Sequence, residues 1–234
     1  MNEGGMARYL FYAIGEIVLV VIGILIALQI DNWNRQYEQN KQEERILRNL
    51  VLDINKDLEQ LTFLRKDSKA RQANIDTLYD LMLEPTRHTS ERFLHLVFPL
   101  FYEGHFEVNS GTFDESLGSG TIRFIRNDTL RQEVFEYYRQ AKLSYADKNA
   151  VKMTYEFIMP QLAETVVPTE EFMNFFTRKE SKLPPIDLEK LSQNKKFMAL
   201  LITKYGNEAD QFNNWSRYLH DGEDLLVGLK KELE

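Results

Sequence analysis

The chain has 234 residues, with 29 Lys and Arg against 36 Asp and Glu and no Cys, so its formal net charge is −7. The acidic balance argues against nucleic-acid binding, which needs Lys and Arg to neutralise phosphates. A chain without Cys has no disulfide scaffold, thiolate zinc site, iron–sulfur cluster or cysteine nucleophile. Its length allows one ordinary domain with an appendage.

An apolar run from Tyr9 to Ile30 is the appendage. At ~1.5 Å per residue it reaches ~33 Å, enough to cross a ~30 Å hydrocarbon core. Aromatic side chains lie at its two ends, where amphipathic rings prefer the headgroup region: Tyr9, Phe11, Tyr12 and Trp33. A cleaved signal peptide is the alternative, but the run is longer than a usual signal core and no A-x-A-like site follows. The run therefore predicts a transmembrane helix in contact with membrane lipid.

The charges that flank this run leave its orientation open. The N-terminal side offers Arg8 and the terminal amine, and the other side offers Arg35, Lys41, Arg45 and Arg48. A bare count of positive charges would place the large domain in the cytoplasm, although the rule weakens for long translocated domains.

The chain after the apolar run shows the helical period. Apolar residues recur at spacings of three and four at Leu47, Leu50, Val51, Ile54, Leu58 and Leu61. This stripe thins between Arg65 and Asn74 and returns with Ile75, Leu78, Tyr79 and Met82. The pair Glu84-Pro85 stops the helix, because a residue before proline avoids the α region. We expect the transmembrane helix to continue into this one as a stalk.

Further helices are predicted beyond the stalk. Thr89 or Ser90 caps a short helix with Phe93, Leu94, Val97 and Phe98. Thr112 and Glu115 match a capping box, and Gly118 and Gly120 suit the end of that helix. Asn127 or Asp128 opens a helix whose stripe is Leu130, Val134, Tyr137, Tyr138, Ala141, Tyr145, Val151, Tyr155 and Ile158. Thr169 and Glu170 open a short aromatic helix with Phe172, Phe175 and Phe176. A last helix of about ten turns carries Phe197, Leu200, Leu201, Phe212, Trp215, Leu219, Leu225 and Leu229.

These elements predict an all-α protein, because no convincing run of alternating strands occurs. The expected division is a short head at 1–8, a single transmembrane helix at 9–30, a stalk at 31–83 and a helical bundle domain at 84–234 that packs with the stalk helix.

Two segments carry a resemblance to a known family. Residues 9–34, YLFYAIGEIVLVVIGILIALQIDNWN, resemble the N-terminal segment of an uncharacterised family of single-pass membrane proteins from Bacteroidota, a domain of unknown function. A second recurring segment of that family is matched by Thr112, Leu117, Gly120, Ile125, Asn127, Leu130, Arg131, Tyr137 and Tyr138. The resemblance implies an inner-membrane anchor, a helical domain and no activity. Members usually carry a basic N-terminal extension, which implies a periplasmic domain, whereas the head here, MNEGGMAR, is nearly neutral.

Glu16 is the most informative residue of the apolar run. It lies seven residues beyond Tyr9, or ~10 Å into the span. A carboxylate at that depth usually faces a protein interior or a partner. Projected on a helix, it shares a sector about 120° wide with small residues that let helices approach closely. This predicted transmembrane interface consists of Tyr12, Gly15, Glu16, Leu19, Gly23 and Ala27. An ion path at Glu16 and an inert, snorkelling Glu16 are the alternatives.

Other candidate sites are weaker. The four His residues are too far apart in sequence for a metal site, and His95 is expected to be partly buried. The glycine turn at 118–121 lacks the lysine of a phosphate-binding loop, so it is interpreted as a helix end. Ser110, Ser116 and Ser119 lack a nearby His and the G-x-S-x-G elbow of a hydrolase. A dense aromatic stretch is either core or a docking patch: Phe98, Leu100, Phe101 and Tyr102.

The sequence supports three functional hypotheses. The first is a membrane-anchored, non-enzymatic assembly protein that forms a homo-oligomer or binds a membrane-protein partner, without a cofactor, a metal or nucleic acid. The second is a periplasmic module that senses a ligand or a peptide. The third is an enzyme, for which no catalytic motif was found.

Overall fold

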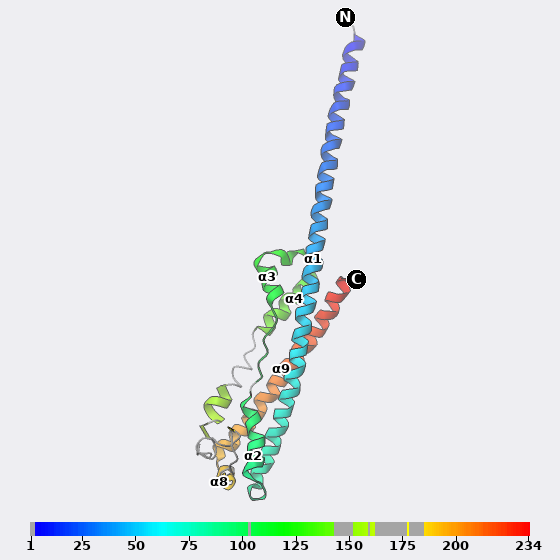
Figure 1. Cartoon of the computed structure of the whole chain (residues 1–234). Helices are drawn as coiled ribbons and strands as arrows, with labels where there is room; N and C mark the ends of the chain where they lie inside the picture. Colours follow the sequence, from blue (N-terminus) through cyan, green and yellow to red (C-terminus); the bar gives the residue numbers. More distant parts are fainter. Residues whose placement is uncertain (1–2, 103, 143–151, 159, 162–176, 178–184) are drawn as a thin grey trace.

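The computed structural model describes residues 3–102, 104–142, 152–158, 160–161, 177 and 185–234, with the backbone alone for residues 3–14, 153 and 158. The described residues form helices joined by loops and contain no strand, so the predicted all-α class is confirmed. Two long helices dominate, α1 (Glu3–Leu83) and α9 (Lys195–Glu232). Figure 1 shows the N-terminal part of α1 projecting from the rest of the chain, with α9 returning beside its C-terminal half.

The expected continuity between the apolar run and the stalk is confirmed, because α1 passes through both without a break. It ends at Leu83, immediately before Glu84-Pro85. The burial of its side chains divides α1 into two parts. Every residue from 15 to 42 is exposed, and the first buried side chain after them is that of Glu43. The C-terminal part of α1 is therefore the spine of the bundle.

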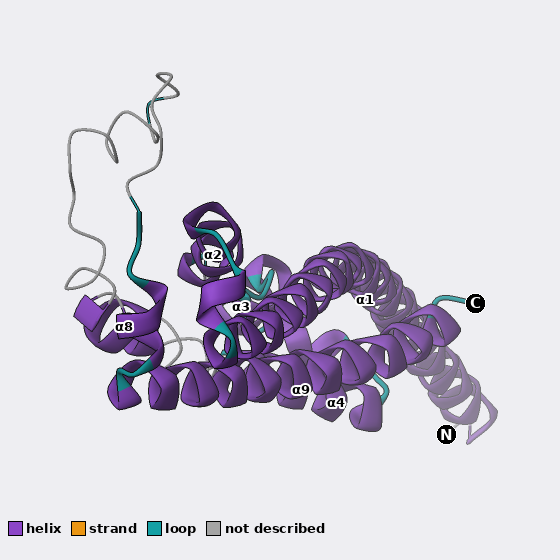
Figure 2. Cartoon of the chain, turned by 90° about the horizontal axis from the view of Figure 1, so that it is seen from below, coloured by secondary structure: helices purple, strands orange, loops and turns teal. Residues whose placement is uncertain are grey.

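The remaining elements are short and pack around this pair of long helices (Figure 2). They are η1 (Pro85–Arg87), α2 (Ser90–Val97), η2 (Phe98–Phe101), α3 (Gly111–Gly118), η3 (Thr121–Phe124), α4 (Asp128–Ala141), the π-helix η4 (Met153–Ile158) and α8 (Leu188–Ser192). Four of the helix starts use predicted or typical caps. The side chains of Thr89, Asn127, Asp187 and Asn194 accept hydrogen bonds from backbone N–H groups in the first turns of α2, α4, α8 and α9.

The predicted capping box at Thr112 and Glu115 is wrong. The cap position is two residues earlier, at Ser110, so α3 begins at Gly111 and Thr112 already lies inside it. The hydroxyl of Ser110 accepts no hydrogen bond from a backbone N–H of the helix and instead donates to the carboxylate of Asp114, 2.6 Å away. The backbone N–H of Thr112 instead donates to Oδ2 of Asp53 on α1, 3.2 Å away. A carboxylate from a distant part of the chain therefore replaces the local cap. The predicted end of the helix holds, because α3 stops at Gly118 and Gly120 has a positive φ of 70°.

The stripe that opens at Leu130 continues less far than predicted. Leu130, Val134, Tyr137, Tyr138 and Ala141 are buried, but α4 ends at Ala141. Tyr155 lies in the separate π-helix and is exposed, so it does not continue the buried face. Residues 143–151, including Tyr145 and Val151, and the predicted aromatic helix after Thr169 lie outside the described residues, as does the side chain of Ile158.

The core follows the antiparallel contact between α1 and α9 in three clusters. The first lies where α1 ends and α9 begins, with α2, η2 and α8 around it: Ile75, Leu78, Leu81, Met82, Phe93, Leu94, Leu96, Val97, Leu100, Ile186, Leu188, Leu191, Phe197 and Leu201. The second lies where the bundle part of α1 begins, beneath α3 and α4: Ile46, Leu47, Leu50, Ile54, Phe113, Ile122, Ile125, Leu130, Val134, Tyr137, Tyr138, Leu225, Leu226 and Leu229. A smaller cluster centres on Trp215: Leu61, Leu64, Phe106, Ala141, Trp215 and Tyr218.

Candidate functional site

The exposed part of α1 is the first candidate site. Among the described residues, α1 is the one helix with a stretch long and apolar enough to cross a membrane, and none of that stretch is buried inside the protein. Its large side chains are open to the surroundings, with Leu19 74% and Ile30 60% exposed. No described element of this chain therefore packs against the segment.

The residues of the predicted transmembrane interface lie on this exposed stretch. Gly15, Glu16, Leu19, Gly23 and Ala27 are all exposed, whereas the side chain of Tyr12 lies outside the described residues. A Cβ atom placed on Gly15 or Gly23 would have no neighbour within 4 Å. The backbone at these two glycines is therefore open to close approach by another helix.

A buried ion cluster between α1 and α9 is the second feature. The carboxylate of Glu208 on α9 lies 3.0 Å from Nε of Arg71 on α1 and 3.0 Å from Nζ of Lys204. Ser68 also donates to Glu208, at 3.1 Å from Oε2 and 3.0 Å from the backbone carbonyl oxygen. Arg71 makes a further ion pair with the half-exposed Asp67. The side chains of Arg71, Lys204 and Glu208 are at most 2% exposed, so these three charges are held together away from water, with Asp67 at the edge of the cluster.

This cluster explains the gap in the apolar stripe of α1. Burial by itself would lower the pKa of Arg71, but the hydrogen bond and charge of Glu208, together with the charge of Asp67, outweigh it and raise that pKa. The guanidinium therefore stays charged.

Sequence reasoning missed the cluster, although the thinning of the apolar stripe between Arg65 and Asn74 marked its position on α1. Its partners on α9 lie in the equally polar stretch between Leu201 and Phe212.

Three carboxylates on α1 fix the loop and helix segment from 109 to 126. Asp57 accepts from both the backbone and the side-chain nitrogen of Asn109, at 2.8 and 2.7 Å. Asp53 accepts from Thr112, as described above. Glu43 accepts from the backbone and the guanidinium of Arg126, at 2.8 and 2.7 Å. Three polar contacts along α1 therefore hold the segment from 109 to 126, which overlaps the second stretch that resembles the family. The pattern of apolar residues predicts none of these contacts.

Asp57 is fully buried and faces a tyrosine hydroxyl. The hydroxyl of Tyr137 donates to Oδ2 of Asp57 over 2.9 Å. Burial raises the pKa of Asp57, while the hydrogen bonds from Asn109 and Tyr137 oppose that rise. Burial and the nearby charge of Asp57 raise the pKa of the Tyr137 hydroxyl, so it remains a proton donor to the carboxylate. The net effect is a carboxyl group that is harder to ionise in the folded protein than in the unfolded chain.

Replacing Asp57 by Asn should reduce the pH dependence of stability. Because the folded pKa of Asp57 is raised, the folded state keeps this proton to higher pH than the unfolded state does. Its contribution to stability therefore falls as pH rises from the unfolded value of ~3.9 through the folded pKa. We expect Asp57→Asn to show a smaller fall in the free energy of unfolding over this window, measured by denaturant titration of the detergent-solubilised chain. Asp210→Asn, at an exposed site, should retain the wild-type slope, and equal slopes for all three proteins would contradict the assignment.

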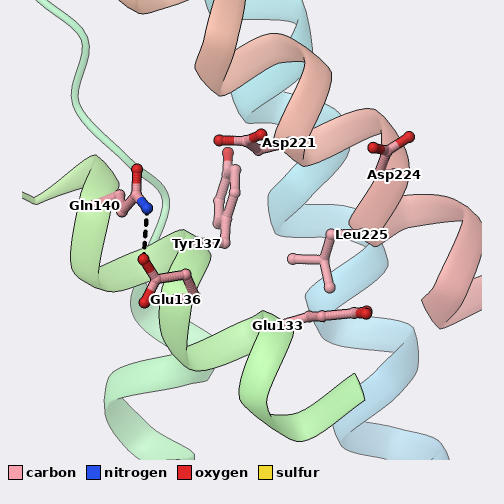
Figure 3. Close-up of a pocket in the computed structure, with 7 residues that line it drawn as sticks. All are labelled: Glu133, Glu136, Tyr137, Gln140, Asp221, Asp224 and Leu225. Carbon is pink, nitrogen blue, oxygen red and sulfur yellow. Dashed lines mark hydrogen bonds between the residues drawn. The ribbon is translucent and has the colours of Figure 1, made fainter. Parts of the chain in front are cut away.

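An open acidic cavity lies between α4 and α9 (Figure 3). Its volume is about 340 Å³, and its lining residues are Glu133, Glu136, Tyr137, Gln140, Asp221, Asp224 and Leu225. Arg139 contacts the carboxylate of Glu136 at 2.6 Å and lowers the pKa of that group. Among the described residues, no three His, Asp or Glu side chains are grouped so that they could hold a metal ion. The cavity thus contributes a local negative potential at the surface.

The aromatic docking patch does not form one surface. Leu100 is fully buried in the first core cluster, and Phe98 and Phe101 are half-buried against it, with their rings 6.2 Å apart. Tyr102 is 74% exposed. The stretch therefore divides between core and surface. His95 also differs from expectation, because its side chain is 72% exposed on the outer face of α2.

Comparison with known proteins gives a match to one family model. No curated protein and no solved structure matches the chain. A family model described as a family of unknown function, DUF6090, matches residues 16–182. The match begins within the exposed apolar stretch of α1 and includes the bundle part of α1 together with α2, α3 and α4. Since it covers more than half of the chain, the protein belongs to the family of unknown function DUF6090.

Proposed function

We propose that this protein is a membrane-anchored, non-enzymatic interaction and assembly protein, held in the bilayer by residues 9–30. The observation that carries the proposal is that every residue from 15 to 42 of α1 is exposed, although most of the first half of this segment is apolar. An exposed apolar surface of this length is not stable in water, whereas lipid and a partner helix can cover it.

The polar and small residues of the stretch favour a partner helix on one side. A carboxyl group in the hydrocarbon region costs several kcal/mol if it is ionised and faces lipid. Glu16 is exposed and shares its face with Gly23 and Ala27, whose small side chains allow close approach. Apolar matching gives no drive for helix association in lipid, so close packing and buried polar contacts must supply it. A second helix on this face would provide both.

Replacing Gly23 by Leu should disrupt the assembled state. The added side chain would hold the two helices apart at their closest point. Val21→Leu places the same side chain on the opposite side of α1, about 160° from Gly23, and is the control for the presence of a Leu in this part of the helix. We expect a lysine-reactive cross-linker, applied to membranes that contain the full chain, to give a higher-mass band for wild type and Val21→Leu that is strongly reduced for Gly23→Leu.

Glu16→Gln separates packing from ionisation, because it keeps a hydrogen-bonding group and removes the charge. We expect this variant to assemble like wild type. A wild-type chain without any cross-linked band, unchanged by Gly23→Leu, would contradict the proposal. If Glu16→Gln assembled but lost biological activity, an ion path through Glu16 would be the better account.

The bundle is proposed to lie in the periplasm, with α1 crossing the inner membrane once. The support is the resemblance of residues 9–34 to single-pass membrane proteins of Bacteroidota, set against the contrary count of flanking charges. Because the chain has no Cys, a single cysteine reports on topology without background. Asn213→Cys, at an exposed site on α9, should react with a membrane-impermeant maleimide in intact spheroplasts. Labelling only after lysis would place the bundle in the cytoplasm.

A further inference from the structure

A polar cavity lies between α1 and α3, at the end of the bundle from which the apolar run projects (Figure 1). Its volume is about 260 Å³, and eight of its nine lining residues are polar. One face of α1 supplies Gln42, Arg45, Ile46 and Asn49, and α3 with the segment after it supplies Thr112, Glu115, Ser116, Ser119 and Thr121. Ile46 and Ser116 are buried and form the floor, whereas the other side chains are partly or fully exposed around it.

The floor of this cavity carries a hydroxyl group without a partner. Ser116 is only 4% exposed, yet its hydroxyl forms no hydrogen bond with any residue that the structure describes. The hydroxyls of Ser119 and Thr121 are 2.8 Å apart and bond to each other, and that of Ser119 also donates to the backbone oxygen of Glu115. Because buried polar groups are normally hydrogen-bonded, the Ser116 hydroxyl is suited to meeting a ligand in the cavity.

Two opposite charges at the rim of the cavity are also unpaired. Within the described part of the chain, Arg45 and Glu115 form no ion pair, either with each other or with a third group. Arg48, three residues beyond Arg45, is by contrast paired with Glu44 at 2.8 Å. A cation from α1 and an anion from α3 therefore border the same cavity without neutralising each other.

This set of groups matches a small molecule that carries both charges. An anion alone would be repelled by Glu115, a metal ion would be repelled by Arg45, and a sugar would leave both charges unpaired. A zwitterion meets both, because a guanidinium binds a carboxylate through two parallel hydrogen bonds and a carboxylate accepts from an ammonium group. The side-chain amides of Gln42 and Asn49 can both donate to and accept from a peptide group.

We propose that this cavity binds a free amino acid or a short peptide, with the ligand's carboxylate on Arg45, its ammonium group on Glu115 and a polar atom on the Ser116 hydroxyl. The inference goes beyond the proposed function and uses a different surface of the protein. The cavity is just smaller than the ~300–1,000 Å³ of sites that hold drug-sized molecules, so its occupant is small.

The position of the cavity favours a ligand from the aqueous phase. Gln42, the lining residue nearest to the apolar run, lies 12 residues beyond Ile30, or ~18 Å along α1. The headgroup layer adds only ~5–8 Å on each side of the hydrocarbon core. The zwitterionic headgroup of a lipid therefore does not reach the cavity when residues 9–30 span the membrane.

Saturation-transfer NMR of the detergent-solubilised full chain with glycylglycine tests the proposal. N-acetylglycylglycine lacks the ammonium group of this probe, and glycylglycinamide lacks its carboxylate. We expect glycylglycine to bind more tightly than either. Glycerophosphoethanolamine represents a lipid headgroup, and tighter binding of this compound than of glycylglycine would overturn the assignment to an amino acid or peptide.

Substitutions at the two charges locate the site. Arg45→Gln and Glu115→Gln should each weaken the binding of glycylglycine by about three- to ten-fold. Arg45→Gln should abolish the preference for glycylglycine over glycylglycinamide, and Glu115→Gln the preference over N-acetylglycylglycine. Arg48→Gln removes a charge that does not line the cavity and should bind like wild type.

Ser116→Ala distinguishes a binding group from a packing group. Because the hydroxyl has no partner among the described residues, its removal should weaken the binding of glycylglycine without lowering the unfolding temperature. Absence of glycylglycine binding to wild type, or an equal loss for Arg45→Gln and Arg48→Gln, would overturn the proposal. Assembly through α1 is a separate result, since Gly23→Leu should bind glycylglycine as wild type does.

Discussion

Replacing Glu208 by Ala should destabilise the bundle by about 3–5 kcal/mol, the usual cost of removing one partner from a buried ion pair. Arg71 and Lys204 would remain buried without the carboxylate that both contact at 3.0 Å. For a chain of this size, each kcal/mol lowers the unfolding temperature by about 2–4 °C, so the loss should be on the order of 10 °C. Circular dichroism of the detergent-solubilised full chain during heating measures it.

Asp210→Ala is the matched control for this variant. Asp210 lies two residues farther along α9 and is exposed, so its removal should shift the unfolding temperature very little. Replacing the three charged partners together, by Arg71→Met, Lys204→Met and Glu208→Leu, should recover most of the lost stability, because no buried charge is then left without its counterpart. An unfolding temperature of Glu208→Ala equal to that of wild type would show that the cluster does not stabilise the contact between α1 and α9.

Two arginines in the middle of the apolar run should release the protein from the membrane. Each Arg near the centre of a transmembrane helix costs about 2.5–3.5 kcal/mol, so Val20→Arg with Ile24→Arg costs about 5–7 kcal/mol. The Leu, Ile, Val and Phe side chains of the run contribute only about 0.3–0.6 kcal/mol each, so this penalty offsets most of what they provide. We expect wild type to stay in the pellet after an alkaline carbonate wash and the variant to leave it.

The same two charges placed outside the run provide the control. Asn32 and Asn34 are exposed on α1 just beyond Ile30, and Asn32→Arg with Asn34→Arg should leave the protein in the pellet. Retention of the Val20 and Ile24 variant would mean that residues 9–30 do not anchor the chain. Loss of both variants would mean that added charge, wherever it lies, weakens attachment to the membrane surface.

The apolar pattern was sufficient to predict the long elements. The period of three and four located the buried face of α1, the end at Leu83 followed from Pro85, and the stripe of α9 placed Phe197, Trp215 and Leu229 in the core. These predictions succeed because burial of one helical face is encoded locally, in residues that are neighbours along the helix.

The polar contacts could not be predicted in the same way. Glu208 meets Arg71 across 137 positions of sequence, and Asp53 caps α3 across 59 positions. In the sequence, charged residues at these sites cannot be distinguished from those of a solvent-exposed helix face, because their partners lie on a distant helix. The capping box at Thr112 failed for this reason, because Thr112 lies inside α3 and its backbone N–H donates to the distant carboxylate of Asp53. The gap between Arg65 and Asn74 indicated where polar burial occurs on α1, although not with which partner.

The sequence predicts an outward-facing surface of α1 only within the apolar run, where Glu16 stands out against its neighbours. The exposure of α1 beyond the run, through Trp33 and Tyr37, follows from the position of the bundle, which begins to bury α1 only at Glu43. A polar stretch such as DNWNRQYEQN carries too few apolar residues to show a face by itself. The side chains that are buried on the turns after Glu43 show which side of α1 faces the bundle.

The number of chains in the native complex tests the central claim most directly. Native mass spectrometry of the unsubstituted full chain, transferred from the membrane into lipid nanodiscs without an intermediate denaturing step, reports that number. The account predicts a complex of more than one chain, two if the partner is a second copy, and a lone chain after Gly23→Leu. A wild-type protein that is a single chain without any partner in the nanodisc would contradict the claim that the outer face of α1 is an interface.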